Sequence, residues 1–191
     1  MVPVVPIPFW QFLDVISVGI ISIVIIWITI NFRRNNDSPL KTISHTVAHT
    51  SRSSLVYSIT MTIFFPLYYA FLWFWVGPTT GAPTVFYMIL IASAVCEMVF
   101  VWVPARRGVK NIIHTTAASF VGMAMFALIV LLAFYGSKIS LAGFVASAIF
   151  LMTTYVLGIL VFFKKFRRQL FLLETIYCVV FIVTMSMIAH F

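Results

Sequence analysis

Residues 85–114 read VFYMILIASAVCEMVFVWVPARRGVKNIIH, and this stretch decides the fold. An apolar run that contains one carboxylate, Glu97, ends at Pro104, and a second apolar run begins near His114. The basic residues of the turn between them are Arg106, Arg107 and Lys110. Because each apolar run is long enough to cross a hydrocarbon core, the stretch predicts two transmembrane helices joined by a cytoplasmic turn.

The composition of the whole chain extends this interpretation. Of its 191 residues, 63% are hydrophobic and 8% are charged. A soluble domain is about half apolar and a quarter charged, because its polar shell faces water. In this chain, lipid-facing side chains take the place of that shell. The composition therefore predicts a polytopic membrane protein and argues against a soluble globular domain.

Six apolar runs predict an all-α fold, a bundle of six transmembrane helices that forms a single domain over residues 1–191. The predicted spans are residues 11–31, 54–76, 84–103, 114–135, 141–163 and 170–191. The uncharged segment GPTTGAP, residues 77–83, predicts a tight turn between the second and third spans. Small residues at Ala118–Gly122 and Gly143–Ser147 predict close helix packing inside the bundle. The aromatic residues within 68–75 are expected at the outer interface.

The positions of the basic residues predict the orientation. Eleven of the twelve Lys and Arg residues fall in three polar segments between spans, and only Lys138 falls elsewhere. These segments are expected in the cytoplasm, which makes the chain a multi-pass cell-membrane protein with extracytoplasmic N- and C-termini. The orientation rests mainly on Arg33, Arg34, Arg106, Arg107, Lys164, Lys165, Arg167 and Arg168. The net charge of +8 comes from these same basic segments. The sequence has no basic face with interleaved aromatic residues, so it does not predict nucleic-acid binding.

Two carboxylates lie within predicted spans. Glu97 is seven residues before Pro104, and Glu174 is about one turn inside the sixth span, so both are expected in the cytoplasmic half. A charged group at membrane depth is costly, so each is expected to have a partner or a function. Candidate partners are Arg106, Arg107, His114 and Arg168. A structural ion pair or hydrogen bond is one interpretation, and proton or ion translocation is another.

His45 and His49 are spaced i, i+4, so one face of a helix could present both imidazoles to a metal ion. With His114 and a glutamate, they could complete a four-ligand site at the inner surface. The alternative is a solvated histidine pair on a polar loop, and on that interpretation we expect no cofactor. Cys96 and Cys178 lie in apolar spans and form no CxxC pair, which favours inert thiols.

Three stretches resemble a known membrane family. They are ISHTVAHTSRSSLVYSITMTIF (43–64), VWVPARRGVKNIIHTTAAS (101–119) and QLFLLETIYCVVF (169–181). Together they are similar to the six-span family of damage-regulated autophagy modulators and GPI-remodelling proteins, with their prokaryotic relatives of unknown function. In that pattern a histidine opens the fourth helix and a glutamate begins the last, which match His114 and Glu174. Eukaryotic members are drawn with a cytoplasmic N-terminus, so the orientation predicted here departs from theirs.

The resemblance implies a non-enzymatic membrane scaffold or a lipid-related regulator, with membrane lipids as partners. A protein partner or a homo-oligomer stays open. A second hypothesis is a proton- or ion-coupled transporter or channel that uses Glu97 and Glu174. A third is a metal-dependent intramembrane hydrolase around His45 and His49. A cavity that reaches Glu97 would favour transport, whereas three converging metal ligands would favour the enzyme.

The orientation yields a prediction. Single cysteines placed at positions 36 and 109 should react with a membrane-impermeant thiol reagent only from the cytoplasmic side, because basic loops stay inside. A cysteine at position 80 should react from the outside. The opposite pattern at all three positions would contradict the charge argument.

Overall fold

The computed structural model describes residues 7–34, 51–103, 108–163 and 170–190, and all regular structure within them is helical. The elements are α1 (Ile7–Arg34), α3 (Ser51–Phe71), the π-helix η1 (Leu72–Val76), α4 (Gly77–Thr80), α5 (Thr84–Trp102), α6 (Val109–Tyr135), α7 (Leu141–Phe162) and α8 (Leu170–His190). The prediction of an all-α polytopic bundle is confirmed.

By length and composition, five helical stretches in the described residues could cross a membrane. They are Ser54–Thr80, Thr84–Trp102, Val109–Tyr135, Leu141–Val161 and Leu172–His190. The first predicted span corresponds to a shorter apolar stretch of α1, Phe12–Ile28. Many large apolar side chains on the outside of the bundle are exposed, among them Ile23, Met88 and Met152. Lipid is the solvent that suits such a surface.

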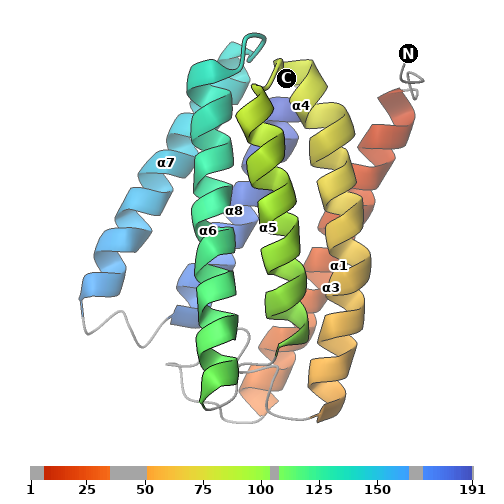
Figure 1. Cartoon of the computed structure of the whole chain (residues 1–191), viewed down its shortest axis with the longest axis vertical. Coiled ribbons are helices and arrows are strands. Elements are labelled where there is room, and N and C mark those ends of the chain that lie inside the picture. Colours follow the sequence, from red (N-terminus) through yellow and green to blue (C-terminus); the bar gives the residue numbers. More distant parts are fainter. Residues whose placement is uncertain (1–6, 35–50, 104–107, 164–169, 191) are drawn as a thin grey trace.

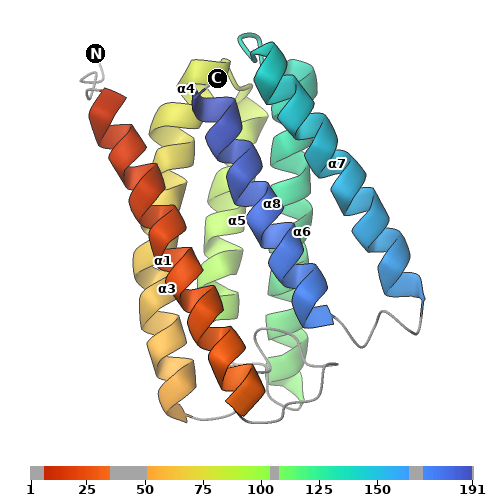
Figure 2. The ribbon, with the colours of Figure 1, turned by 180° about the vertical axis from the view of Figure 1, so that it is seen from behind.

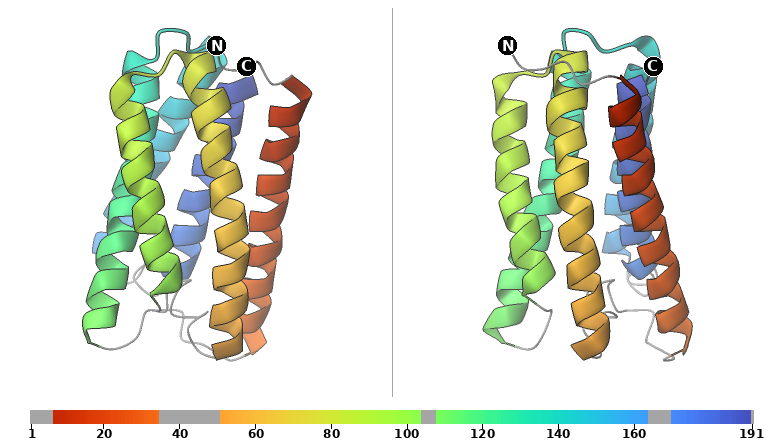
Figure 3. Two further views of the ribbon diagram at one scale, coloured as in Figure 1. Left: turned by 45° about the vertical axis from the view of Figure 1, so that its right-hand side comes forward. Right: turned by 90° about the vertical axis from the view of Figure 1, so that its right-hand side faces the viewer.

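The helices form two layers. Figure 1 shows α3, α5 and α6 in front, and α1, α8 and α7 behind them. The opposite view in Figure 2 agrees, with α1, α8 and α7 nearest the viewer. α7 leans away from α6 toward the end opposite α4. The start of α1 and the end of α8 both lie at the α4 end, as the turned views also show (Figure 3).

The end of the second span differs from the prediction. Residues 77–83 were expected to form a turn, but Gly77–Thr80 continue the helix as α4, after the π-helical segment η1. Only Gly81, in the left-handed region at φ 63°, ends it. There the Lys138 amide donates to the Thr80 carbonyl at 3.0 Å, which ties this turn to the α6–α7 turn. Composition identified the turn residues, but the turn itself begins four residues later than predicted, at Gly81.

The start of α6 also differs from the prediction. The fourth span was expected to start at His114 after a loop at 105–113, whereas the helix begins at Val109. Gly108 precedes it with a φ of 79°, a conformation that favours glycine. The basic Lys110 therefore belongs to the first turn of α6, where its side chain is exposed. His114 becomes a residue inside the helix instead of its first residue.

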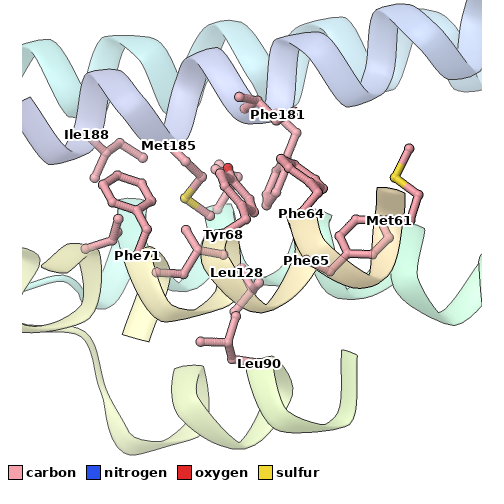
Figure 4. Close-up of a cluster of buried hydrophobic side chains, with 14 of the residues drawn as sticks. Met61, Phe64, Phe65, Tyr68, Phe71, Leu90, Leu128, Phe181, Met185 and Ile188 are labelled. Atoms are coloured by element: carbon pink, nitrogen blue, oxygen red, sulfur yellow. The ribbon is translucent and has the colours of Figure 1, made fainter. Parts of the chain in front are cut away.

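The core contains aromatic side chains that the sequence had suggested would lie at the outer interface. Tyr68 is 4% exposed and Phe71 is fully buried, although Phe74 in the same run is half exposed. Figure 4 shows Tyr68 and Phe71 of α3 directed toward Phe181, Met185 and Ile188 of α8. The Tyr68 ring stacks on Phe64 and meets Phe181 edge-on. These side chains join the front layer to the back layer.

One of the two small-residue pairs packs as predicted. Gly143 of α7 lies so close to α8 that an added Cβ would be 3.4 Å from the Ile188 Cα, and Ser147 beside it is fully buried. Ser147 donates to the Gly143 carbonyl, so its hydroxyl needs no partner on α8. Small side chains thus allow α7 to lie against α8 near the start of α7.

Candidate functional site

A cavity of about 260 Å³ lies between the two helix layers. Its walls come from α1, α3, η1, α5, α6 and α8, and among the described residues α7 contributes none. Most of the lining side chains are apolar, and many of them are aromatic. Both acidic residues singled out by the sequence, Glu97 and Glu174, line this one cavity. Both acids therefore border the same interior space of the bundle.

The second small-residue pair explains part of the cavity. Ala118 and Gly122 were predicted to bring two helix backbones together, but both line the cavity. A Cβ added at Gly122 would have no atom within 4 Å outside its own helix turn, so space faces this residue. The prediction of close packing at Ala118–Gly122 is wrong because the facing helix stands away from α6 at this level. Small side chains here leave room instead of drawing helices together.

Glu97 is 2% exposed and is held by neutral hydroxyl groups. The Tyr69 hydroxyl of α3 donates to Glu97 Oε2 at 2.7 Å, and it also lies 2.7 Å from Ser93 Oγ, one turn before Glu97 on α5. A hydroxyl has one proton to give, so if Tyr69 gives it to Glu97, the Ser93 hydroxyl donates to Tyr69. The result is a short chain of hydrogen bonds that joins α3 to α5.

Glu174 enters the same cavity from α8 and is only partly buried. One turn further along, the Tyr177 hydroxyl donates to the Gly122 carbonyl at 2.7 Å. This bond crosses from the back layer to the front layer beside the cavity. Tyr177 therefore sets the distance between α8 and α6 where Gly122 leaves space, and it also lines the cavity.

His114 does not bind either acid in the described structure. Its Nδ1–H donates to the Val103 carbonyl at 2.7 Å, just beyond the end of α5, and its ring meets Phe100 edge-on. Of the four candidate partners of the acids, His114 is thus engaged by the backbone at the end of α5 instead. Its Nε2 is buried and has no hydrogen-bond partner among the described residues.

Side chains from α3 and α6 bind the backbone at the C-terminal end of α5. The Ser58 hydroxyl donates to the Val101 carbonyl at 2.8 Å, while His114 binds Val103. The Trp102 indole donates to the Thr62 hydroxyl at 3.1 Å. The last carbonyls of a helix have no partner within the helix, and in lipid an unmet carbonyl is costly. These bonds fix the end of α5 and therefore the position of Glu97.

A second polar cluster lies at the α4 end of the bundle, between α1 and α8. Asp14 is 5% exposed and accepts from the Ser186 hydroxyl at 2.9 Å and from His190 Nε2 at 3.2 Å. None of these three residues lines the cavity.

The metal hypothesis falls on residues that the structure does not describe. His45 and His49 lie outside the described residues, as do Arg106, Arg107, Lys164, Lys165, Arg167 and Arg168, while only the backbone of Arg33 and Arg34 is described. Within the described ranges, no group of three or more His, Cys, Asp or Glu residues could hold a metal ion.

Sequence reasoning missed the partner of Glu97. Ser93 could be placed on the same face of its helix from the spacing i, i+4. Tyr69 could not, because its aromatic neighbours suggested the outer interface and nothing in the pattern shows which helix faces α5. One signal was available. Tyr69 lies more than one turn inside its span, and a tyrosine hydroxyl that is buried there requires a hydrogen-bond partner.

We expect Ser93 to serve as a reserve partner for Tyr69. Glu97→Gln should change the free energy of unfolding little, because an amide oxygen can still accept. Glu97→Leu combined with Ser93→Ala should cost about 1–3 kcal/mol beyond the sum of the two single variants, since only the pair leaves the buried Tyr69 hydroxyl unpaired. Unfolding in mixed detergent micelles measures this. Strict additivity would show that the three residues do not act as one unit.

Comparison of the chain with known protein families, with curated proteins and with solved structures finds no match. The cavity and the side chains around Glu97 are therefore the observations on which a proposed function has to rest.

Proposed function

We propose that this chain is a non-enzymatic, lipid-related membrane protein that binds a small apolar or amphipathic molecule between its two helix layers. The observation that carries the proposal is the cavity of about 260 Å³ with largely apolar walls. Its volume is close to the lower end of the roughly 300–1,000 Å³ typical of ligand pockets. Such pockets combine apolar walls with a few polar groups, as Glu97 and Tyr69 provide here.

The energetics of cavities support an apolar occupant. An apolar cavity that nothing fills forfeits the dispersion contacts that its walls could make. Water gains little there because apolar walls offer it few hydrogen bonds. A hydrocarbon chain or ring recovers the lost contacts, and the surrounding membrane is a source of such molecules. The resemblance to a family with lipid-related members supports the same class of function.

We also propose six spans, with both termini on the extracytoplasmic side of the cell membrane. The shared position of the start of α1 and the end of α8 supports an even number of crossings (Figure 1). For the cysteine-labelling test of this orientation, Ser137 is a better outside position than Thr80. Ser137 is exposed at the α4 end, whereas Thr80 is 2% exposed and a cysteine there would be hidden from the reagent.

A second candidate is a proton- or ion-coupled transporter. It is favoured by one specific observation, namely that Glu97 and Glu174 line the same cavity. A carboxyl group at membrane depth can carry a proton or bind a cation, and intramembrane acids mark such pathways in many transporters. Binding and transport are compatible, since a transporter must also bind its cargo.

The first test fills the cavity. Gly122→Leu adds a side chain into the space that faces α8, and it should displace whatever small molecule co-purifies with the protein. Mass spectrometry of the purified protein should show the molecule in the wild type and less than about one tenth of it in the variant.

The matched control is Gly158→Leu. Gly158 also has no atom within 4 Å of an added Cβ, but it is exposed on α7, which does not line the cavity. This variant should keep the wild-type amount of the bound molecule. Equal retention by both variants would contradict binding in the cavity.

The second test concerns transport. In proteoliposomes with a pH-sensitive dye, Glu97→Gln should abolish any proton flux that the wild type shows, while its thermal unfolding stays close to that of the wild type. If the variant keeps the proton flux of the wild type, Glu97 is not part of the proton pathway.

A further inference from the structure

The cavity is lined by an acid whose hydrogen-bond partner is neutral, Glu97. Among the described residues that line the cavity there is no Lys, Arg or His. Glu97 is nine-tenths buried or more and has a neutral phenol, Tyr69, as its hydrogen-bond partner. A buried carboxylate without a nearby cation is costly, because the interior screens and solvates it poorly. A positive charge placed in the cavity would remove that cost.

The walls around the acids suit a particular kind of cation. Aromatic rings line the cavity from three helices: Tyr57, Phe64 and Tyr69 on α3, Phe100 on α5, and Tyr177 and Phe181 on α8. The faces of such rings attract cations, and this attraction grows when water is excluded. A small hydrated metal ion gains little from aromatic walls. An organic cation keeps its apolar groups against them and gives up little hydration.

The lining also offers a place for an apolar body. Met61, Phe64 and Phe181 lie on facing sides of the layers, as Figure 4 shows, and they belong to the cavity walls. Tyr68, which packs between Phe64 and Phe181, has a buried hydroxyl with no hydrogen-bond partner among the described residues. The site therefore combines apolar contact area with a polar group that no described residue satisfies.

We propose that the cavity is a binding site for a hydrophobic organic cation, such as an alkyl or aryl ammonium compound. Its charge lies at Glu97 among the aromatic rings, and its apolar body lies along α3 and α8. The assignment rests on the proposed function and names the class of molecule that this cavity selects. Neutral lipids of the same shape bind more weakly, because they leave the carboxylate without a counter-charge.

A matched pair of probes tests the role of charge. Benzyltrimethylammonium and neopentylbenzene have nearly the same shape, but the quaternary nitrogen of the first is a neutral carbon in the second. Binding of each is measured by saturation-transfer NMR with the protein in phosphatidylcholine nanodiscs, whose surface has no net charge. Gly122→Leu in the same nanodiscs gives the background due to partition into lipid. The wild type should bind the cation about tenfold more tightly or better.

Two variants then locate the preference. Glu97→Gln keeps the shape and the hydrogen bond to Tyr69 but removes the charge, and it should bring the two affinities to within about twofold. The control is Asp14→Asn, because Asp14 is a buried acid at the outer end that does not line the cavity. It should retain the full preference for the cation.

The outcomes separate the two proposals. Equal binding of both probes to the wild type, lost in Gly122→Leu, would overturn the selection for cations and leave the cavity as a binding site. A preference that survives Glu97→Gln would overturn the role of Glu97. Binding of neither probe above the Gly122→Leu background would overturn both proposals. The comparison of the probes on the wild type needs no variant, so a variant that fails to fold does not block the test.

Discussion

The arrangement of the bundle depends on how Glu97 is accommodated inside a membrane. A carboxyl group at this depth cannot face lipid without a large cost, so α5 turns it inward, toward α3. Tyr69 then binds it and joins the two helices, and Ser93 binds Tyr69. The position of Glu97 along α5 is fixed in turn by bonds at the C-terminal end of that helix, where Ser58 and His114 bind the last carbonyls. One polar requirement thus contributes directly to how α3 and α5 lie against one another.

The contacts between the two layers are of another kind. Packed rings of α3 and α8, Tyr68 with Phe181 among them, join the layers at the wall of the cavity. The bond from Tyr177 to the Gly122 carbonyl joins them beside it. At the α4 end, Asp14 of α1 is bound by Ser186 and His190 of α8. Between these connections, the small residues of α6 leave interior space unfilled by protein side chains.

Small residues have opposite effects at two places in this fold. Gly143 lets α7 lie against α8, and the dispersion contacts between the two helices stabilise this close packing. Gly122, in a similar sequence pattern, faces the cavity because Tyr177 and the aromatic rings hold α8 away. The pattern by itself states only that close approach is sterically allowed. Whether it occurs depends on the side chains of the helix that stands opposite.

The sequence alone determined the class of fold and the residues that require burial. Hydropathy predicted the helices, since a lipid environment needs long apolar runs, and the isolated acids marked Glu97 and Glu174 before any contact was known. The exact ends of the helices were harder to predict. Gly77–Thr80 stay helical as far as Gly81 and α6 begins directly after Gly108, and these two glycines with positive φ mark the actual helix ends.

Only the tertiary structure decided which side chains meet. Tyr69 reaches Glu97 and His114 reaches Val103, although neither pairing follows from spacing along the chain. In a membrane bundle nearly every face of a helix is apolar, so periodicity does not reveal which face meets another helix and which meets lipid. The partner of a buried polar group depends on how the helices are packed, and packing is a property of the assembled bundle. The cavity has the same origin, because it is defined by side chains from helices that are distant in the sequence.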